Sequence, residues 1–218
     1  MVKRARKSAA RLPAAARRRE PERKRARLLA AARNLFAERG YAATTTAQLA
    51  READVAEGTV FHHFVSKRAL LEAVAGEYGR GLAERMFAGV GATESEPAAE
   101  PMLRRAFAYV REQGALSRLL VLAPDPTEWS VARAASRREI VSALAAAFAS
   151  WRGREGLRAF DPVIVAELLF ALVEAALSGC FVHGDGSREP EYLRETIACV
   201  EGALFARSPV TLHARSSS

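Results

Sequence analysis

Residues 28–74 read LLAAARNLFAERGYAATTTAQLAREADVAEGTVFHHFVSKRALLEAV, and this stretch decides the fold. In its first part Leu28, Ala32 and Leu35 recur at i, i+4 and i+7, which puts them on one face of a helix. We expect that helix to run from Pro21 to Arg39, because the glycine that follows stands where glycine commonly ends a helix.

The next part of the stretch predicts two short helices joined by a tight turn. Thr45 is the expected N-cap of the first, residues 54–56 form the turn, and the second covers about Glu57–Phe64. Two helices of this kind let the second enter the DNA major groove while the first braces the backbone. Ser66 then caps a longer helix over about 67–88.

Helical periodicity continues along the chain, and no run of alternating apolar and polar residues predicts a strand. A loop is expected over 89–100, where small and polar residues gather. Further helices are expected over 101–122 with a break at Gly114, from Asp125-Pro126 to Trp151, over 162–182 and over 190–207. In Asp125-Pro126 and in Asp161-Pro162, an N-cap precedes a proline at the first helical position. The chain is therefore predicted to be all-α.

Positive charge is concentrated at the start of the chain. Residues 1–27 hold twelve basic residues against Glu20 and Glu22, a net charge of +10, whereas the rest of the chain brings the total down to +8. A basic arm beside a folded module is an electrostatic footprint for phosphate backbones. Two other interpretations stay open: a solvated, unstructured tail, and a start codon placed too early.

The N-terminus and the cysteines favour a reduced, cytoplasmic protein. The opening residues MVKRARKSAARLPAAARRR lack the apolar core of a secretory signal. Cys180 and Cys199 are too few for a disulfide framework in a chain of this size. A redox switch at these thiols is one interpretation, but buried, inert thiols are favoured.

The quoted stretch resembles the DNA-binding domain of the TetR family of bacterial regulators. The resemblance rests on an F-x-x-x-G-Y helix end at Phe36–Tyr41, a threonine-rich cap, the helix-turn-helix, and an aromatic-x-His-Phe-x-Ser-Lys run at Phe61–Lys67. It implies an N-terminal three-helix DNA-binding domain followed by a helical ligand-binding and dimerisation domain. The expected organisation is a basic, unstructured arm over 1–20, the DNA-binding domain over 21–66, the ligand-binding and dimerisation domain over 67–207, and a loose tail over 208–218.

The second short helix is expected to meet base edges, and its surroundings are expected to meet phosphates. Thr59 suits a base or a thymine methyl group, and Gly58 permits close approach because it lacks a side chain. The resemblance implies phosphate contacts at His63 and Lys67, and a base or phosphate contact at His62. The predicted DNA-binding residues are Thr45, Thr46, Glu57, Gly58, Thr59, Phe61, His62, His63 and Lys67.

Four residues depart from the family's pattern. Phe61 stands where tyrosine is usual and lacks the hydroxyl that would contact a phosphate. Ala56 replaces a serine cap, which weakens the helix start by roughly 1 kcal/mol. Asp54 replaces a turn glycine, although aspartate tolerates left-handed backbone better than most residues. Glu57 suits cytosine N4 but repels phosphates, so we expect the basic arm to compensate.

The helix expected after Asp161 is apolar almost all the way round. Its length would suit a bilayer, but Glu167 and Glu174 would be costly there. A helix that is apolar on all sides is buried on all sides, so one face is expected to pack on its own subunit and the other on a partner. The resemblance assigns this helix and the last one to a homodimer interface, with candidate contacts Val173, Leu177, Phe181, Tyr192, Ile197 and Val200.

The resemblance also implies a small-molecule pocket in the C-terminal domain. Apolar walls with a few polar groups are typical of such pockets, and plain core packing is the alternative for each candidate. The candidates are Met86, Phe107, Tyr109, Trp129, Arg133, Phe148, Trp151, Phe170 and Glu174. Glu174 would either bind a cationic ligand or pair with an arginine of its own chain, and the internal pair is favoured.

These features predict a cytoplasmic, sequence-specific transcriptional regulator that binds double-stranded DNA. The leading form is a homodimeric repressor released from a near-palindromic operator by a small-molecule effector, with an activator or a ligand-independent regulator as alternatives. A basic architectural protein is a second class, which would bind DNA broadly. An enzyme is disfavoured, because no phosphate loop, nucleophile elbow or G-x-G-x-x-G motif is present. No cofactor, metal or membrane association is predicted.

Overall fold

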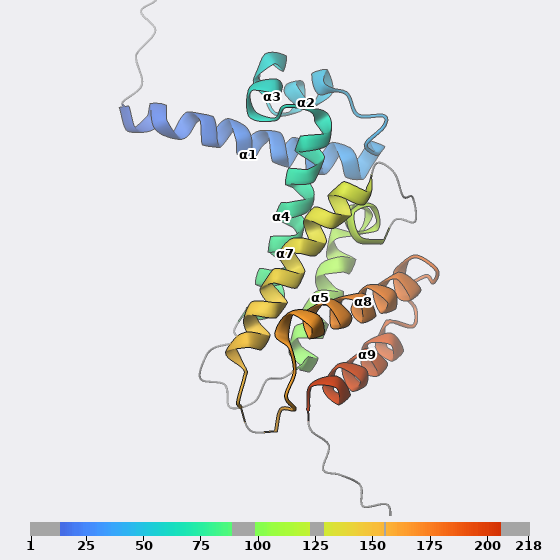
Figure 1. Ribbon diagram of the computed structural model, residues 1–218. Coiled ribbons are helices and arrows are strands. Elements are labelled where there is room, and N and C mark those ends of the chain that lie inside the picture. Colours follow the sequence, from blue (N-terminus) through green and yellow to red (C-terminus); the bar gives the residue numbers. More distant parts are fainter. Residues whose placement is uncertain (1–13, 89–98, 123–128, 155, 206–218) are drawn as a thin grey trace, which may run out of the picture. The chain divides into compact units, whose positions relative to one another are not determined.

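The structure is a computed structural model, and it describes residues 14–88, 99–122, 129–154 and 156–205 (Figure 1). These residues form helices and no strand, which confirms the predicted all-α class. The helices are α1 (Ala14–Arg39), α2 (Thr46–Glu52), α3 (Glu57–His63), α4 (Lys67–Phe87), α5 (Ala99–Gln113), α6 (Ala115–Ser117), the π-helical turn η1 (Arg118–Leu122), α7 (Trp129–Ser150), α8 (Pro162–Phe181) and α9 (Glu189–Leu204). The chain divides into two compact units, Met1–Leu71 and Glu72–Ser218.

The first unit is built on the apolar face that the sequence predicts for its first helix. Leu28, Phe36, Leu49, Val60 and Leu70 are completely or almost completely buried in it. Burial of such side chains stabilises the unit by roughly 1.5–3 kcal/mol each. Helices α2 and α3 have seven residues each and would not be stable alone in water, so this shared core holds them in place.

Local signals set the ends of these helices as predicted. Gly40 takes a left-handed φ of 79° and its N–H donates to the Phe36 carbonyl at 3.0 Å. Thr45 caps α2 with its hydroxyl oxygen, which accepts from Gln48 N–H, while the Gln48 side chain accepts from Thr45 N–H. Ser66 caps α4 in the same way by accepting from Ala69 N–H at 3.0 Å.

The start of α1 differs from the prediction. The helix begins at Ala14 rather than Pro21, so residues 14–20 of the arm predicted to be unstructured are helical. The physical reason is that alanine and arginine are strong helix formers, and the run over 14–19 outweighs the break expected at Pro21. Residues 1–13 of the predicted arm lie outside the described part of the chain.

In the second unit α8 packs against α7 and α9, and α9 also packs against α5. The part of α4 from residue 72 onward contacts α5 and α7. Figure 1 shows α7 beside α8 and α8 beside α9. Two glycines of α4 permit close helix contacts. A Cβ atom on Gly79 would lie 2.6 Å from the Ser136 carbonyl oxygen, and one on Gly81 would lie 2.7 Å from the Tyr109 hydroxyl.

The ends of the helices in this unit follow the predicted breaks closely. Gly114 separates α5 from α6 with a φ of 45°. Asp161 caps α8, because its Oδ1 accepts from Val163 N–H at 2.8 Å and from Ile164 N–H at 3.1 Å. The predicted cap at Asp125-Pro126 and the tail from 206 onward lie outside the described residues.

Candidate functional site

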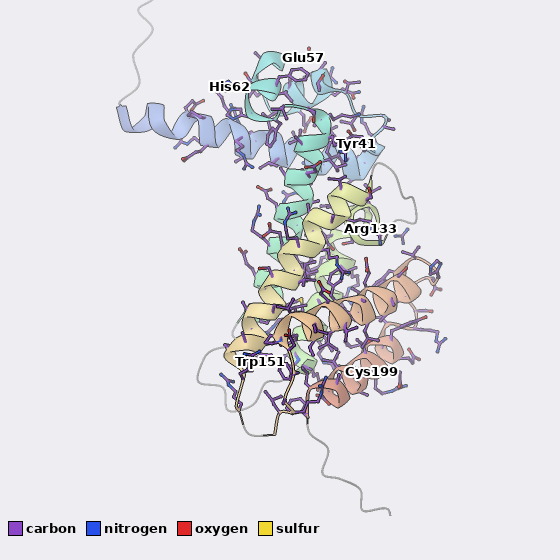
Figure 2. The ribbon with its side chains drawn as sticks, in the orientation of Figure 1. Tyr41, Glu57, His62, Arg133, Trp151 and Cys199 are labelled. Carbon is purple, nitrogen blue, oxygen red and sulfur yellow. The ribbon has the colours of Figure 1, made fainter. Side chains whose placement is uncertain are left out.

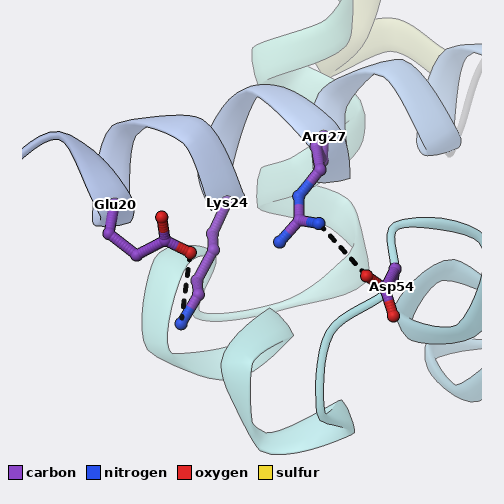
Figure 3. Close-up of polar contacts among 4 residues, drawn as sticks. All are labelled: Glu20, Lys24, Arg27 and Asp54. Carbon is purple, nitrogen blue, oxygen red and sulfur yellow. Dashed lines mark hydrogen bonds and ion pairs between the residues drawn. The ribbon is translucent and has the colours of Figure 1, made fainter. Parts of the chain in front are cut away.

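The turn between α2 and α3 is held in a left-handed conformation. Asp54 has a φ of 50°, and Val55 N–H donates to the Ala50 carbonyl at 2.9 Å. Arg27 of α1 reaches the turn, with Nη1 3.3 Å from Asp54 Oδ2 (Figure 3). The pair is exposed, so its main effect is to orient the turn rather than to stabilise it strongly. The arrangement gives the tight turn that a helix-turn-helix needs.

Helix α3 has one face buried and the other in solvent. Val60 is completely buried and anchors the helix to the core of its unit. Glu57, Gly58, Phe61 and His62 are exposed, and Figure 2 shows Glu57 and His62 at the surface of this unit. The exposed residues, together with the half-buried Thr59 and His63, belong to the set predicted to contact DNA.

A hydrogen bond ties the two helices of the motif together at their exposed ends. Thr46 Oγ1 donates to Glu57 Oε1 at 2.8 Å. The bond fixes the orientation of the carboxylate and leaves it an acceptor, since a carboxylate offers about four lone-pair sites. Thr45 is exposed beside it and keeps a hydroxyl hydrogen to donate, because its oxygen is the atom that caps α2.

Lys67 has an internal role that the resemblance did not imply. Its Nζ donates to the Tyr41 and Thr44 carbonyls at 2.9 Å each and lies 4.1 Å from the centre of the Tyr41 ring. Two of the three ammonium hydrogens are thus bonded to the loop before α2. The side chain straps that loop to the start of α4, and one donor at most is left for a phosphate.

A hollow separates α1 from α3 on the surface of the first unit. It is lined by Glu20, Pro21, Lys24, Gly58, Thr59, His62 and His63. Lys24 lies 4.0 Å from Glu20 across one helical turn (Figure 3). The contribution of α1 to this surface was not predicted residue by residue, and the only signal for it in the sequence is the basic run over 17–27.

The environment of His63 disfavours its protonation. Partial burial lowers the pKa of His63, and the neighbouring His62, Arg25 and Lys24 lower it further. The His62 and His63 rings lie 5.2 Å apart. A phosphate bound in this hollow would raise the pKa of His63 again, because an anion favours the protonated imidazole.

A separate cavity lies within the second unit. Five of the nine predicted pocket residues line it: Met86, Phe148, Trp151, Phe170 and Glu174. The others have different positions. Phe107 is completely buried 6.3 Å from the Phe181 ring, Tyr109 donates its hydroxyl to the Tyr78 carbonyl, and the side chain of Trp129 lies outside the description.

Arg133, the remaining predicted pocket residue, is the partner of Glu174. Its Nη2 lies 3.2 Å from Glu174 Oε1, so the internal pair that the sequence favoured is formed. The sequence did not assign the other residues of the cavity wall to a pocket. These are Leu82, Ala99, Met102, Leu103, Ala106, Ile140, Leu144, Leu169, Val173, Leu177, Val200 and Leu204.

The six residues predicted for a dimer interface fall into two groups within one chain. Val173, Leu177 and Val200 line the cavity. Phe181, Tyr192 and Ile197 are half-buried. The apolar row that α8 exposes is instead made of Val163, Ile164 and Leu168, which are 56%, 58% and 64% exposed.

By length and composition alone, helix α8 could cross a membrane, although only a third of its apolar stretch is buried within the chain.

Cys180 at the end of α8 is buried, and burial raises the pKa of its thiol, which keeps it protonated. Cys199 on α9 is exposed, contrary to the expectation that both thiols are buried. In the described part of the chain no three His, Cys, Asp or Glu residues gather as metal ligands.

The first unit matches a known family. Residues 28–74 fit the family described as bacterial regulatory proteins, tetR family. An uncharacterized HTH-type transcriptional regulator of Bacillus subtilis, YvkB, is 42% identical over 24% of this chain and 28% of its own. The HTH-type transcriptional regulator UidR of Escherichia coli is 38% identical over 23% of this chain and 26% of its own. These matches span about a quarter of each relative's length.

Solved structures match over most of the chain. A TetR-family transcriptional regulator from Pectobacterium atrosepticum is 28% identical with a TM-score of 0.62, covering 88% of this chain and 99% of that one. Salmonella enterica GusR is 26% identical with a TM-score of 0.63, covering 85% and 97%. The relatives and the fold are those of transcription regulators, which are not enzymes.

Proposed function

Because the chain is a TetR-family transcriptional regulator, we propose that it is a homodimeric repressor that leaves a near-palindromic operator when a small molecule occupies the cavity of its second unit. The observation that carries the proposal is the exposed face of α3. It presents hydrogen-bonding side chains on a helix that Val60 anchors from behind. A helix of this kind reads base edges from the major groove.

The DNA-binding surface of the proposal has two parts. Glu57, Gly58, Thr59, Phe61 and His62 face the bases from α3. Thr45, Thr46, His63 and the basic start of α1 face phosphates, and Lys67 holds the loop in front of α2 in place. Phosphate contacts set the register on the duplex and base contacts give the sequence preference.

The proposed dimer forms through α8 and α9. A row of three large apolar side chains in solvent is costly for a monomer and is typical of an interaction surface. A second copy of the chain would cover it and would also explain why α8 is apolar on nearly all sides without a membrane. Two-fold symmetry then pairs two copies of α3 with two inverted half-sites. Such a regulator works in the cytoplasm, where the DNA is.

The cavity supports the proposal of a switch. An apolar molecule that binds one arrangement of the second unit better than another shifts the population toward the first. The effector would favour an arrangement whose paired α3 helices no longer match the half-sites, and the operator would be released.

The experiment is a selection of random-sequence duplexes by the purified full chain, with native mass spectrometry of the selected complex. We expect an inverted repeat bound by two chains. Transcription in vitro from a promoter that carries this repeat should fall as protein is added. A pool without a motif, whose binding collapses as salt rises, would support the architectural alternative instead. A rise in transcription would identify an activator.

A further inference from the structure

We propose that a polar hollow of the second unit binds a small zwitterion, namely an α-amino acid with a short apolar side chain. The hollow lies where the end of α5, the short helix α6 and the loop after α8 meet. It is separate from the apolar cavity, since no residue lines both. A ligand site here goes beyond the proposed function, and the charges, the size and the fixed shape of the hollow point to its occupant.

Two of the four charged side chains in the hollow balance each other. Arg111 Nη1 forms a salt bridge with Glu189 Oε1, and the Glu189 side chain is only 19% exposed. This hydrogen bond raises the pKa of Arg111, so the guanidinium stays charged. The pair therefore leaves neither charge for a ligand to compensate.

Arg118 and Asp185 are the other two charged side chains, and they are not balanced. Both line the hollow and both are exposed. In the part of the chain that the structure describes, no ion pair joins either of them to another residue. A ligand carboxylate pairs well with a guanidinium, and a ligand ammonium group pairs with a carboxylate. A zwitterion matches both side chains, whereas a simple anion or cation leaves one of them unpaired.

The hollow has the size of a small amino acid. Its volume is about 260 Å³. A water molecule takes about 30 Å³ in the liquid, so the hollow has room for roughly nine non-hydrogen atoms, which is the size of leucine. Val110 and Phe181 give the wall an apolar part beside the charges. Burial of a short hydrocarbon side chain against them would add to the binding free energy.

The loop that carries Asp185 is held in one shape. Gly186 has a φ of 82°, and its N–H donates to the Cys180 carbonyl at 3.0 Å. Ser187 N–H donates to Asp185 Oδ1 at 2.8 Å, and hydrogen bonds from Ser187 lower the pKa of Asp185. The carboxylate is therefore ionised at neutral pH and keeps lone pairs for a further donor. A group that is already fixed costs less entropy to bind.

One wall residue connects the hollow to α4. Ser117 lines the hollow, and its Oγ lies 2.8 Å from the hydroxyl of Tyr78 on α4. The π-helical turn η1 follows α6 directly, and irregular turns of this kind are frequent at functional sites. The first residues of α4 belong to the DNA-binding unit. A ligand that displaces Ser117 changes a contact of α4, so we expect it to change the affinity for DNA.

Three probes that share one hydrocarbon skeleton test the chemistry. We would titrate L-leucine, 4-methylpentanoate, which lacks the amino group, and 3-methylbutylamine, which lacks the carboxylate, into the full chain and follow the heat of binding. Leucine is expected to bind at least fivefold more tightly than either of the others. No binding of leucine at millimolar concentrations, or equal binding of leucine and one of its analogues, would overturn the proposal.

A first pair of variants tests the cation. Arg118→Gln removes the guanidinium that would take the carboxylate, so the affinity for leucine should fall at least fivefold. Arg138→Gln makes the same change at an exposed position of α7 outside the hollow and should leave the affinity unchanged.

A second pair of variants tests the anion. Asp185→Asn keeps an oxygen that accepts from Ser187 N–H and removes the charge. The preference for leucine over 4-methylpentanoate should therefore fall at least fivefold. Glu201→Gln, at an exposed position of α9, should keep that preference. Circular dichroism confirms that each variant is folded.

These titrations contain no DNA, so their outcome is separate from that of the proposed function. Leucine that binds Arg118→Gln and Asp185→Asn as it binds the unaltered chain occupies some other site, and the proposal is then wrong. Ser117→Ala keeps both charges, so it should bind leucine but lose the effect of leucine on the affinity for the selected duplex. If leucine binds in the hollow of the unaltered chain and leaves that affinity unchanged, the ligand site stands and its connection to α4 is wrong.

Discussion

At the scale of single residues, Ala56 leaves the recognition helix α3 without a cap. No side chain accepts a hydrogen bond from the first turn, as the sequence predicts for alanine at this position. Ala56→Ser should supply an acceptor for Gly58 or Thr59 N–H and stabilise the helix by about 1 kcal/mol. Hydrogen exchange at these two amides should slow by about fivefold.

Ala47→Ser is the matched control for this prediction. Ala47 is exposed in the first turn of α2, where Thr45 already provides the cap. The control should leave exchange at Gly58 and Thr59 unchanged. Equal slowing in both variants would show that the added hydroxyl acts by some route other than capping α3.

If His63 contacts a phosphate as proposed, the affinity for DNA should depend on pH. Burial and the neighbouring cations lower its pKa below 6.5 in the free protein, so it is neutral at pH 7.5. A nearby phosphate raises that pKa again, so binding takes up a proton and the affinity should rise by about three- to tenfold from pH 7.5 to pH 5.5. Fluorescence anisotropy with the selected duplex measures this change.

His63→Gln should flatten that profile, and His183→Gln, in an exposed loop of the second unit, should not. An affinity that falls on acidification in the unaltered chain would contradict the placement of a phosphate in the hollow beside α3.

Residue-scale features were predictable where their partners are close in sequence. The caps at Thr45, Ser66 and Asp161 bond to amides two or three residues away, so the local pattern contains them. Lys67 was not predictable in this way, because the carbonyls it binds belong to Tyr41 and Thr44, in a loop more than twenty residues earlier.

At the scale of elements, helix α1 extends into the basic start of the chain. Residues 1–20 hold eight of the basic residues, and α1 already begins within them at Ala14. Deleting residues 1–20 should weaken DNA binding and flatten its salt dependence, because each phosphate contact that is lost lowers the logarithmic slope by about 0.9.

A full-length variant with Arg17, Arg18 and Arg19 changed to alanine keeps the helix formers and removes only charge. If the helical part of the arm contacts phosphates, this variant should show part of the decrease in the salt dependence of DNA binding that the deletion causes. Binding that is unchanged by the deletion, at every salt concentration, would contradict a role for the arm.

Element boundaries were predicted well where a residue with a special backbone stands at the break. Gly40 and Gly114 end helices at positive φ, and these ends match the sequence. The start of α1 does not match, since the sequence predicts Pro21 as the first residue of the helix and Pro21 lies inside it. A proline sets a local preference that a run of strong helix formers can override.

At the scale of the whole molecule, the apolar row on α8 should control assembly. Leu168→Glu puts a charge at a position that is 64% exposed in one chain, so folding of the subunit should be affected by less than about 0.5 kcal/mol. The dimer should dissociate, and affinity for the selected inverted repeat should fall at least tenfold, because each half-site then binds alone. Sedimentation velocity measures the dissociation of the dimer.

Ala149→Glu adds the same charge on the exposed side of α7 and should leave the dimer intact. A chain that sediments as a monomer before any substitution would contradict the proposed assembly.

The sequence predicted that the second unit is helical, but it did not predict which face of α8 is buried in the subunit and which face is exposed. An amphipathic helix shows its buried side through its polar residues, and α8 has too few of them. Val173 and Leu177, which the sequence predicts at a dimer interface, also line the cavity, and the exposed Val163, Ile164 and Leu168 were not singled out. Only the packing of α5, α7 and α9 against α8 separates the two faces.

The central claim is that two copies of α3 read a symmetric site, and a comparison of selected duplexes tests it most directly. The unaltered chain and Glu57→Gln would each be used to select from the same random pool. We predict that the motif of Glu57→Gln differs from that of the unaltered chain at one position in each half-site, at mirror-related places, because Glu57 is proposed to face one base in each half. Identical motifs, or a change in one half only, would contradict recognition by paired α3 helices.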